Sequence, residues 1–219
     1  MRIIRVYFTK TGEASYISLL DLQRVMQRAL KRSGLPVWYT LGFNPHIYMT
    51  FAAPLSLGQE SLCETVDFKT EADACDWGAA AGALSTCLPK GIDVVRIAPA
   101  ILDANEIADA AYSVRYAAKD AAAARAAWEA YNGTPCAEVV KEGKRGKQKT
   151  IDLKQHLPAA RLVPEDGGLT ALLRLPAGNT LNINPVLVLG WLEETQGLPV
   201  TAGGILRTGL YTKNGEKFS

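Results

Sequence analysis

The imidazole of His46 is the side chain in this sequence that comes closest to acid–base chemistry near neutral pH. It closes the run Gly42-Phe43-Asn44-Pro45-His46 and is one of two histidines in the chain. Glycine permits conformations that other residues avoid, and a residue before proline is driven into an extended conformation, so this run predicts a sharp turn. With Glu64 or Tyr48 as a partner, His46 would be the candidate for an RNA-cleaving or RNA-modifying enzyme. A lone histidine is more often structural.

A second kind of chemistry, the binding of an anion, is indicated by residues 18–33. Ser18 is placed as a helix N-cap with Asp21 three residues on, and apolar residues recur on one face at the helical period. The opposite face carries four cations, which are Arg24, Arg28, Lys31 and Arg32. Asp21 is the only acid in the segment that could pair with them, so the face would suit an anionic partner such as RNA. The alternative is a solvated polar face, which many surface helices have.

A further basic segment, 141–149, has five cations and one acid around two glycines. This composition predicts a hairpin whose basic side chains grip an RNA backbone. The alternative is a solvated hairpin whose charges prevent pairing with another strand. The residues that we expect to contact RNA are Arg24, Arg28, Arg32, Asn44, His46, Lys144, Arg145 and Lys147.

The strand predicted after the turn carries Glu64, which faces the basic helix in one interpretation and pairs with Arg28 to fix the fold in the other. The aromatic rings of Tyr39, Phe43 and Tyr48 would stack on RNA bases if they were exposed, and would belong to the core if they were buried.

These motifs resemble the radical-SAM-linked protein family, a bacterial family of undefined function. The matching residues are Ser18, Leu20, Asp21, Arg28, Ala29, Arg32, Gly34 to Pro36, Gly42 to His46, Pro54, Leu55, Gly58, Ser61, Glu64 and Arg207 to Tyr211. The resemblance implies a structural motif made of Ser18, Asp21, Gly42, Phe43, Pro45, Gly58, Ser61 and Glu64. It also implies a radical SAM protein as partner, because family members are fused to such proteins or encoded beside them. Leu19 replaces the family's usual histidine and Lys31 replaces an arginine, so a base at position 19 would be missing here.

Composition limits the function classes. The chain has 219 residues, of which 48% are hydrophobic and 21% charged, as in ordinary globular proteins. No apolar run reaches the ~18 residues of a membrane span, and the first residues predict a strand rather than a signal peptide, so we expect a cytoplasmic protein without membrane contact. The four cysteines form no Cys-x-x-Cys pair and no iron–sulfur motif. We therefore expect no metal site and no cofactor, and the chain cannot itself be a radical SAM enzyme of the usual kind.

The order of predicted elements indicates an α+β fold of two tandem ferredoxin-like (βαββαβ) domains with antiparallel sheets, at residues 1–100 and 110–219. In the first domain we expect strands at 2–10, 37–41, 46–53, 63–70 and 92–97, and helices at 18–33 and 74–87, the latter capped by Asp73. In the second we expect strands at 112–116, 137–141, 150–153, 169–175 and 205–213, and helices at 119–131 and 186–196, the latter introduced by Asn184-Pro185.

Together these features predict a non-catalytic RNA-binding or substrate-presenting accessory module that acts with a radical SAM enzyme in RNA modification, with tRNA as the first RNA to test. The first alternative is the enzyme based on His46. The second is a protein-interaction module whose acidic middle region docks a basic partner, because residues 51–113 carry ten Asp/Glu and three Lys/Arg.

Overall fold

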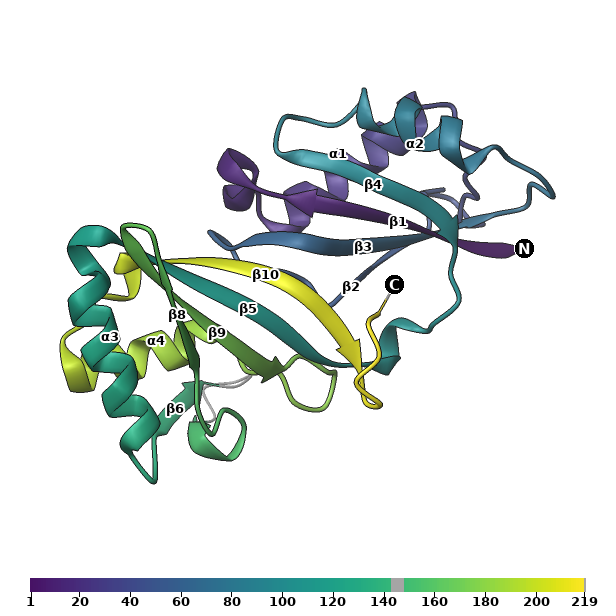
Figure 1. Cartoon of the computed structure of the whole chain (residues 1–219). Helices are drawn as coiled ribbons and strands as arrows, with labels where there is room; N and C mark the ends of the chain where they lie inside the picture. Colours follow the sequence, from purple (N-terminus) through teal and green to yellow (C-terminus); the bar gives the residue numbers. More distant parts are fainter. Residues whose placement is uncertain (143–147, 219) are drawn as a thin grey trace. The chain divides into compact units, whose positions relative to one another are not determined.

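The structure is a computed structural model that describes residues 1–142 and 148–218. It divides into two compact units (Figure 1), Met1–Ile107 together with Phe218, and Ala108–Lys217. Within the described residues, no helix is long and apolar enough to cross a membrane.

The first unit is a four-stranded antiparallel sheet with two helices. Its elements are β1 (Arg2–Lys10), α1 (Leu19–Arg32), β2 (Met49–Ala52), β3 (Glu60–Thr70), α2 (Trp77–Ser85) and β4 (Ile92–Pro99), with short 3-10 helices at Gly12–Tyr16 and Ala104–Glu106. The strand order is β4-β1-β3-β2. Alternate residues Ile4, Val6 and Phe8 of β1 pack into one core with the apolar face of α1.

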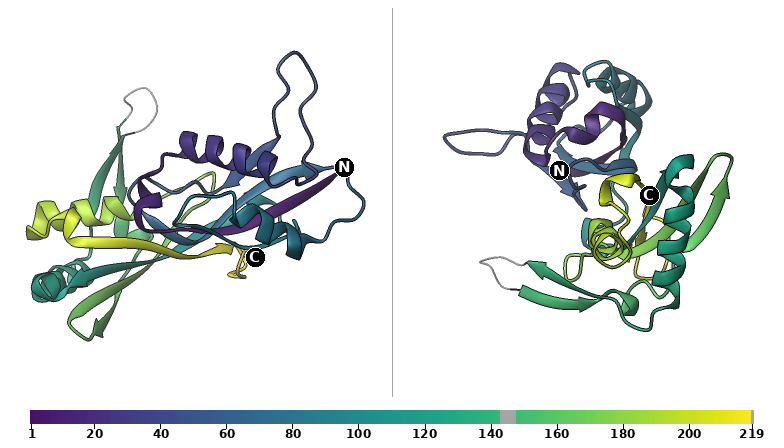
Figure 2. Two further views of the ribbon diagram at one scale, coloured as in Figure 1. Left: turned by 90° about the horizontal axis from the view of Figure 1, so that it is seen from above. Right: turned by 90° about the vertical axis from the view of Figure 1, so that its left-hand side faces the viewer.

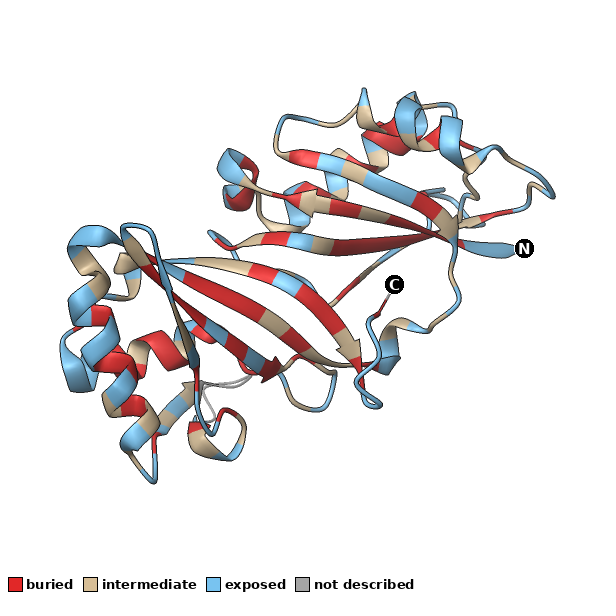
Figure 3. Ribbon diagram, in the orientation of Figure 1, coloured by how far each residue is buried: buried red, intermediate tan, exposed pale blue. Residues whose placement is uncertain are grey.

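The second unit also packs two helices on a sheet. Its elements are β5 (Ile107–Ala117), α3 (Ala118–Gly133), β6 (Glu138–Glu142), β7 (Gln148–Asp152), β8 (Arg161–Glu165), β9 (Gly168–Pro176), α4 (Pro185–Gln196) and β10 (Gly203–Thr212), with 3-10 helices at Leu153–Gln155 and Val200–Ala202. The sheet has the order β10-β5-β9-β8, while in the described part of the chain β6 and β7 form a separate two-stranded sheet. Buried residues run along these strands (Figure 3). They do not simply alternate with exposed ones, because Ser113 of β5 and Thr170 of β9 are buried between buried neighbours.

The predicted α+β class is confirmed, and so are the helices that carry strong local signals. Three details were wrong. The segment 37–41 forms only an isolated bridge between Tyr39 and Ile47 rather than a strand. The strand β8 was not predicted, because it contains Pro164 and proline is unfavourable within a strand. The second helix begins after Asp76, whose carboxylate accepts hydrogen bonds from the next turn, rather than after Asp73.

Candidate functional site

The cations of α1 lie on its solvent face. Arg24, Arg28, Lys31 and Arg32 are exposed, whereas Leu22, Met26, Ala29 and Leu30 of the same helix are buried. The helix begins as the sequence predicts, with the Ser18 hydroxyl accepting a hydrogen bond from the Asp21 backbone nitrogen at 3.2 Å. The amphipathic pattern therefore places all four charges where a ligand can reach them.

Among the described residues, only one of these cations forms an ion pair. Arg24 Nη1 lies 3.0 Å from Asp21 Oδ1, and both side chains are more than half exposed. Hydrogen bonds from the Ser18 hydroxyl and from Arg24 lower the pKa of Asp21, so its carboxylate stays ionised at neutral pH. Arg28, Lys31 and Arg32 form no ion pair with any described residue.

The turn after α1 is a hairpin that projects from the first unit (Figure 2). Its base is closed by a hydrogen bond from the Thr40 nitrogen to the His46 oxygen at 2.8 Å and by the bridge between Tyr39 and Ile47. Gly42 has a φ of +125°, which a residue with a side chain rarely adopts. The hairpin, residues 38–48, is thus fixed by its own backbone rather than by burial of its tip.

The ring of His46 is used to hold this hairpin. Its Nδ1 lies 3.0 Å from Thr40 Oγ1 and 3.2 Å from the Asn44 carbonyl oxygen, and its backbone nitrogen donates to Thr40 Oγ1 at 3.1 Å. No hydrogen bond joins His46 to Glu64 or Tyr48 in the part of the chain that the structure describes. The acid–base set that the catalytic alternative needs is therefore not assembled around this imidazole.

The tip of the hairpin displays apolar side chains. Phe43 is fully exposed and Leu41 is 91% exposed, with exposed Asn44 beside them. At the base, the Lys69 ammonium lies 4.0 Å from the ring centre of Tyr48 and 5.6 Å from that of Trp38, a cation–π arrangement that fixes both rings. Of the aromatic residues considered for base stacking, Phe43 is therefore the one that is open to solvent on all sides.

Of the remaining residues of the expected motif, Ser61 and Glu64 are interior and Gly58 is exposed. Ser61 is fully buried and Glu64 is 2% exposed, while Gly58 has a φ of +78° and donates its backbone hydrogen to the Ser15 oxygen at 3.0 Å. The alternative in which Glu64 pairs with Arg28 is wrong, because Arg28 is exposed and has no ion pair among the described residues. Ser61 and Glu64 therefore belong to the interior side of β3 and line no surface, whereas Gly58 shapes the exposed loop before β3.

The basic segment of the second unit is described only at its ends. Lys141 Nζ donates to the Asn182 carbonyl oxygen at 2.6 Å, and Lys149 is exposed on β7. Lys144, Arg145 and Lys147, which we expect to contact RNA, lie outside the described residues.

Sequence reasoning missed a second cluster of polar side chains, in the second unit. Arg161, Arg174 and His156 line a cavity of ≈ 570 Å³ together with Asp109 and several apolar residues, Leu172 and Pro158 among them. Arg174 could have been noticed in the sequence, because it is a charge within the apolar run 169–175. The strand that carries Arg161 could not, because Pro164 argues against a strand at these residues. Across the described residues, no group of three or more His, Cys, Asp or Glu side chains is arranged to hold a metal ion.

Comparison with known families gives one match that covers most of the chain. A family described as "Uncharacterized protein conserved in bacteria (DUF2344)" matches residues 3–185, which include α1, the projecting hairpin and the second unit up to the start of α4. No curated protein matches the chain.

Proposed function

The chain belongs to this family of uncharacterized proteins conserved in bacteria, and from that premise we propose that it is a non-catalytic module that binds RNA, or presents it as a substrate, beside a radical SAM enzyme. The observation that carries the proposal is the row of exposed cations on α1, of which Arg28, Lys31 and Arg32 have no ion pair among the described residues.

The spacing of this row suits a polyanion. Residues three and four apart on a helix have Cβ atoms about 5–6 Å apart, so three like charges at 28, 31 and 32 repel one another in the free protein. An RNA strand relieves that repulsion and releases its own counterions, which supplies a salt-dependent driving force. Two of the three are arginines, whose forked donors match phosphate oxygens.

The projecting hairpin supplies a different kind of contact. Phe43 and Asn44 are exposed at its tip, next in sequence to the helix that carries the cations. Proteins read unpaired RNA by stacking bases on aromatic rings and by hydrogen bonding to base edges. We therefore assign phosphate contacts to Arg24, Arg28 and Arg32 and base contacts to the hairpin, where His46 keeps the tip in shape.

Two further considerations support the proposal. The strand orders β4-β1-β3-β2 and β10-β5-β9-β8 support two tandem ferredoxin-like domains, a plan that RNA-binding modules often use, although fold alone assigns no function. We infer the radical SAM partner from the resemblance of the sequence motifs. We infer a cytoplasmic location because the proposed ligand is RNA.

A filter-binding assay with cellular tRNA across a salt series tests the proposal. We expect retention that falls steeply with salt, and a salt slope smaller by roughly 1.5 in the double variant Arg28→Ala/Arg32→Ala, because two phosphate contacts are lost. The matched control is Lys119→Ala/Arg125→Ala, which removes the same charge from exposed positions of α3 in the second unit. No salt-dependent retention, or equal losses in both double variants, would reject the α1 surface.

A further inference from the structure

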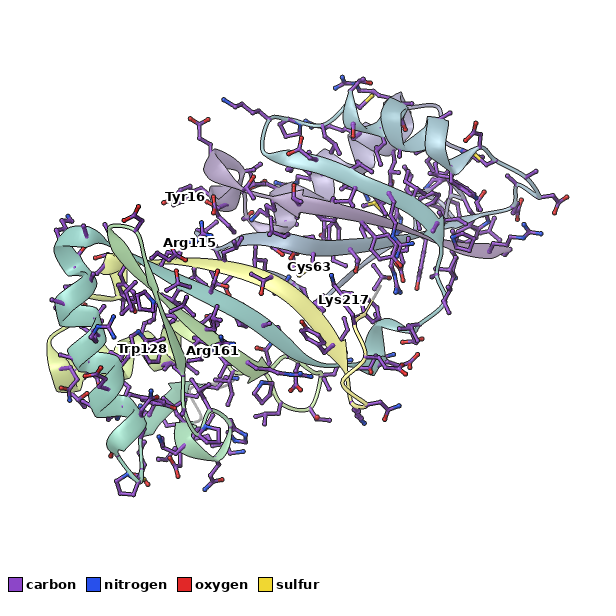
Figure 4. The ribbon with its side chains drawn as sticks, in the orientation of Figure 1. Tyr16, Cys63, Arg115, Trp128, Arg161 and Lys217 are labelled. Atoms are coloured by element: carbon purple, nitrogen blue, oxygen red, sulfur yellow. The ribbon has the colours of Figure 1, made fainter. Side chains whose placement is uncertain are left out.

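One face of the second sheet is turned away from its helices, and three exposed arginines lie on it with the acids Asp109 and Glu165. Trp128 of α3 donates its indole hydrogen to the Tyr116 hydroxyl at 3.1 Å, so the face of β5 that carries Tyr116 is the one that α3 covers. Side chains alternate along a strand, so Arg115 points to the other face. Figure 4 marks Arg115 on β5, Trp128 on α3 and Arg161 on β8.

Strand register places two more arginines on this face. Ser113 of β5 and Arg161 of β8 both oppose Leu172 of β9, and Arg174 lies two residues farther along β9. Opposed residues share a face, and a diagonal pair such as Arg161 and Arg174 has Cα atoms about 7–8 Å apart. Both guanidinium groups are within reach of a single anionic group between them.

The cavity of ≈ 570 Å³ lies where these arginines meet the segment 155–159. Leu172, which is 37% exposed, and the exposed Pro158 contribute apolar surface to the lining, whereas Leu157 is only 3% exposed. His156 adds an imidazole to the lining. Sites for small ligands combine a largely apolar lining with a few placed polar groups, and this volume lies within their usual range of about 300–1,000 Å³.

Arg174 is held in place before any ligand arrives. Its Nε lies 3.2 Å from Asp109 Oδ2, and its guanidinium carbon lies 4.4 Å from the ring centre of Tyr211. Its Nη atoms make no hydrogen bond, and Arg161 makes neither a hydrogen bond nor an ion pair, with any described residue. The two arginines outnumber the one carboxylate of the cavity, so its charge is positive.

We propose that this cavity binds a nucleotide, with the phosphate held by Arg161 and Arg174 and the base against Pro158 and Leu172. Charged residues on the edge strand β8 also discourage pairing with another chain, but that role explains only Arg161. It does not explain a cavity lined by an arginine that a carboxylate and an aromatic ring fix in place. The forked donors of two arginines match a phosphate group better than they match a halide or a lone carboxylate.

The phosphate can come from a free nucleotide or from one nucleotide of an RNA strand. In the second case the inference rests on the proposed RNA function and adds a second contact to it. In the first case the site stands by itself. The α1 surface and this cavity share no residue, so each can fail without the other.

Isothermal titration calorimetry with 5′-AMP, inorganic phosphate and a short 5′-phosphorylated RNA oligonucleotide tests the site, with adenosine as the probe that lacks a phosphate. We expect 5′-AMP to bind and adenosine not to bind. Arg161→Gln should weaken 5′-AMP at least about tenfold, the loss of one charge-assisted phosphate contact. The control Arg125→Gln removes an exposed arginine of α3 and should leave the affinity unchanged, and thermal melting should show both variants folded.

The arms of the experiment separate the sources of phosphate. Binding of 5′-AMP that depends on Arg161 identifies a nucleotide pocket, and it should persist in Arg28→Ala/Arg32→Ala. Binding of the oligonucleotide alone, again dependent on Arg161, identifies a contact to an RNA strand. The proposal is overturned if none of the phosphate probes binds, or if Arg161→Gln binds them as tightly as the native protein does.

Discussion

The two units have corresponding helices and strand orders but carry their exposed cations in different places. In the first unit four exposed cations form a row on α1, and one of the four is paired. The corresponding helix α3 is rich in alanine, and its exposed Arg125 lies 4.0 Å from Glu129. Three other exposed arginines of the second unit, Arg115, Arg161 and Arg174, lie on the face of the sheet away from α3. Two units with the same strand order can therefore carry their charges on different surfaces.

The interiors differ in the same way. The first unit buries a charge, because Arg5 is fully buried and bonds both carboxylate oxygens of Asp67 at 2.7 Å. Burial opposes the charged form of Arg5, but the hydrogen bond and charge of Asp67 outweigh it and raise the pKa of Arg5. The second unit also buries a charged residue, Arg207. It adds an aromatic cluster in which the ring of Tyr131 lies 5.7 Å from Trp128 and 5.4 Å from Trp191. We therefore expect the Arg5–Asp67 pair to contribute strongly to the first unit and aromatic packing to contribute strongly to the second.

The largest expected effect comes from breaking that ion pair. Asp67→Ala leaves the buried guanidinium of Arg5 without its carboxylate, and we expect a loss of about 3–5 kcal/mol in the free energy of unfolding, measured in urea. The matched control is Asp109→Ala in the second unit, which breaks an exposed pair with Arg174 and should cost no more than about 1 kcal/mol. Equal losses in the two variants would contradict the contrast between the units.

A second prediction concerns high pH and the second unit. Burial raises the pKa of Tyr116 to about 12, and it also raises the pKa of Tyr131. Because the folded pKa lies above the unfolded value of about 10, this stability is complete below pH ~10 and is lost as the pH rises through about 12. For Tyr116 the shift corresponds to about 2–3 kcal/mol. Tyr116→Phe should reduce the alkaline loss, which urea unfolding at several pH values measures. Unchanged alkaline sensitivity in this variant would assign the loss to other groups.

The features that could be predicted from the sequence are those set by residues close together in the chain. The start and the buried face of α1 follow from Ser18 and the helical period, and α4 begins at Pro185 after Asn184, whose side chain accepts from the Val186 nitrogen at 3.0 Å. Contacts between distant residues leave no such signal.

Arg5 and Asp67 are 62 residues apart, and only the register of β1 with β3 brings them together. The cavity of Arg161 and Arg174 likewise needs the pairing of β8 with β9. The exposure of Phe43 was undecidable from sequence, since an aromatic residue in a turn can fold back onto the core or stand free.

A smaller effect is expected at the starts of α1 and α3. Ser18 caps α1 through its side chain, whereas Ala117 at the same place before α3 has extended backbone angles but no capping group. Ser18→Ala should cost about 1 kcal/mol, and Ala117→Ser should stabilise the second unit by a similar amount. Urea unfolding of both variants checks this. A neutral result for Ala117→Ser would mean that the first turn of α3 is already satisfied by solvent.

The smallest effect tests whether the ion pair on α1 matters for RNA binding. Arg24 must leave Asp21 to contact a phosphate, whereas Arg28 has no such competitor among the described residues. We expect Arg28→Ala to lower the salt slope of tRNA binding by about 0.7–0.9 and Arg24→Ala to lower it less. In an Asp21→Asn background the two arginines should become equivalent, because the carboxylate that stays ionised at neutral pH is gone. The difference in affinity is at most about 1 kcal/mol, the strength of a surface pair. If Arg24→Ala and Arg28→Ala lower the salt slope of tRNA binding equally with Asp21 intact, the ion pair between Arg24 and Asp21 does not affect RNA binding.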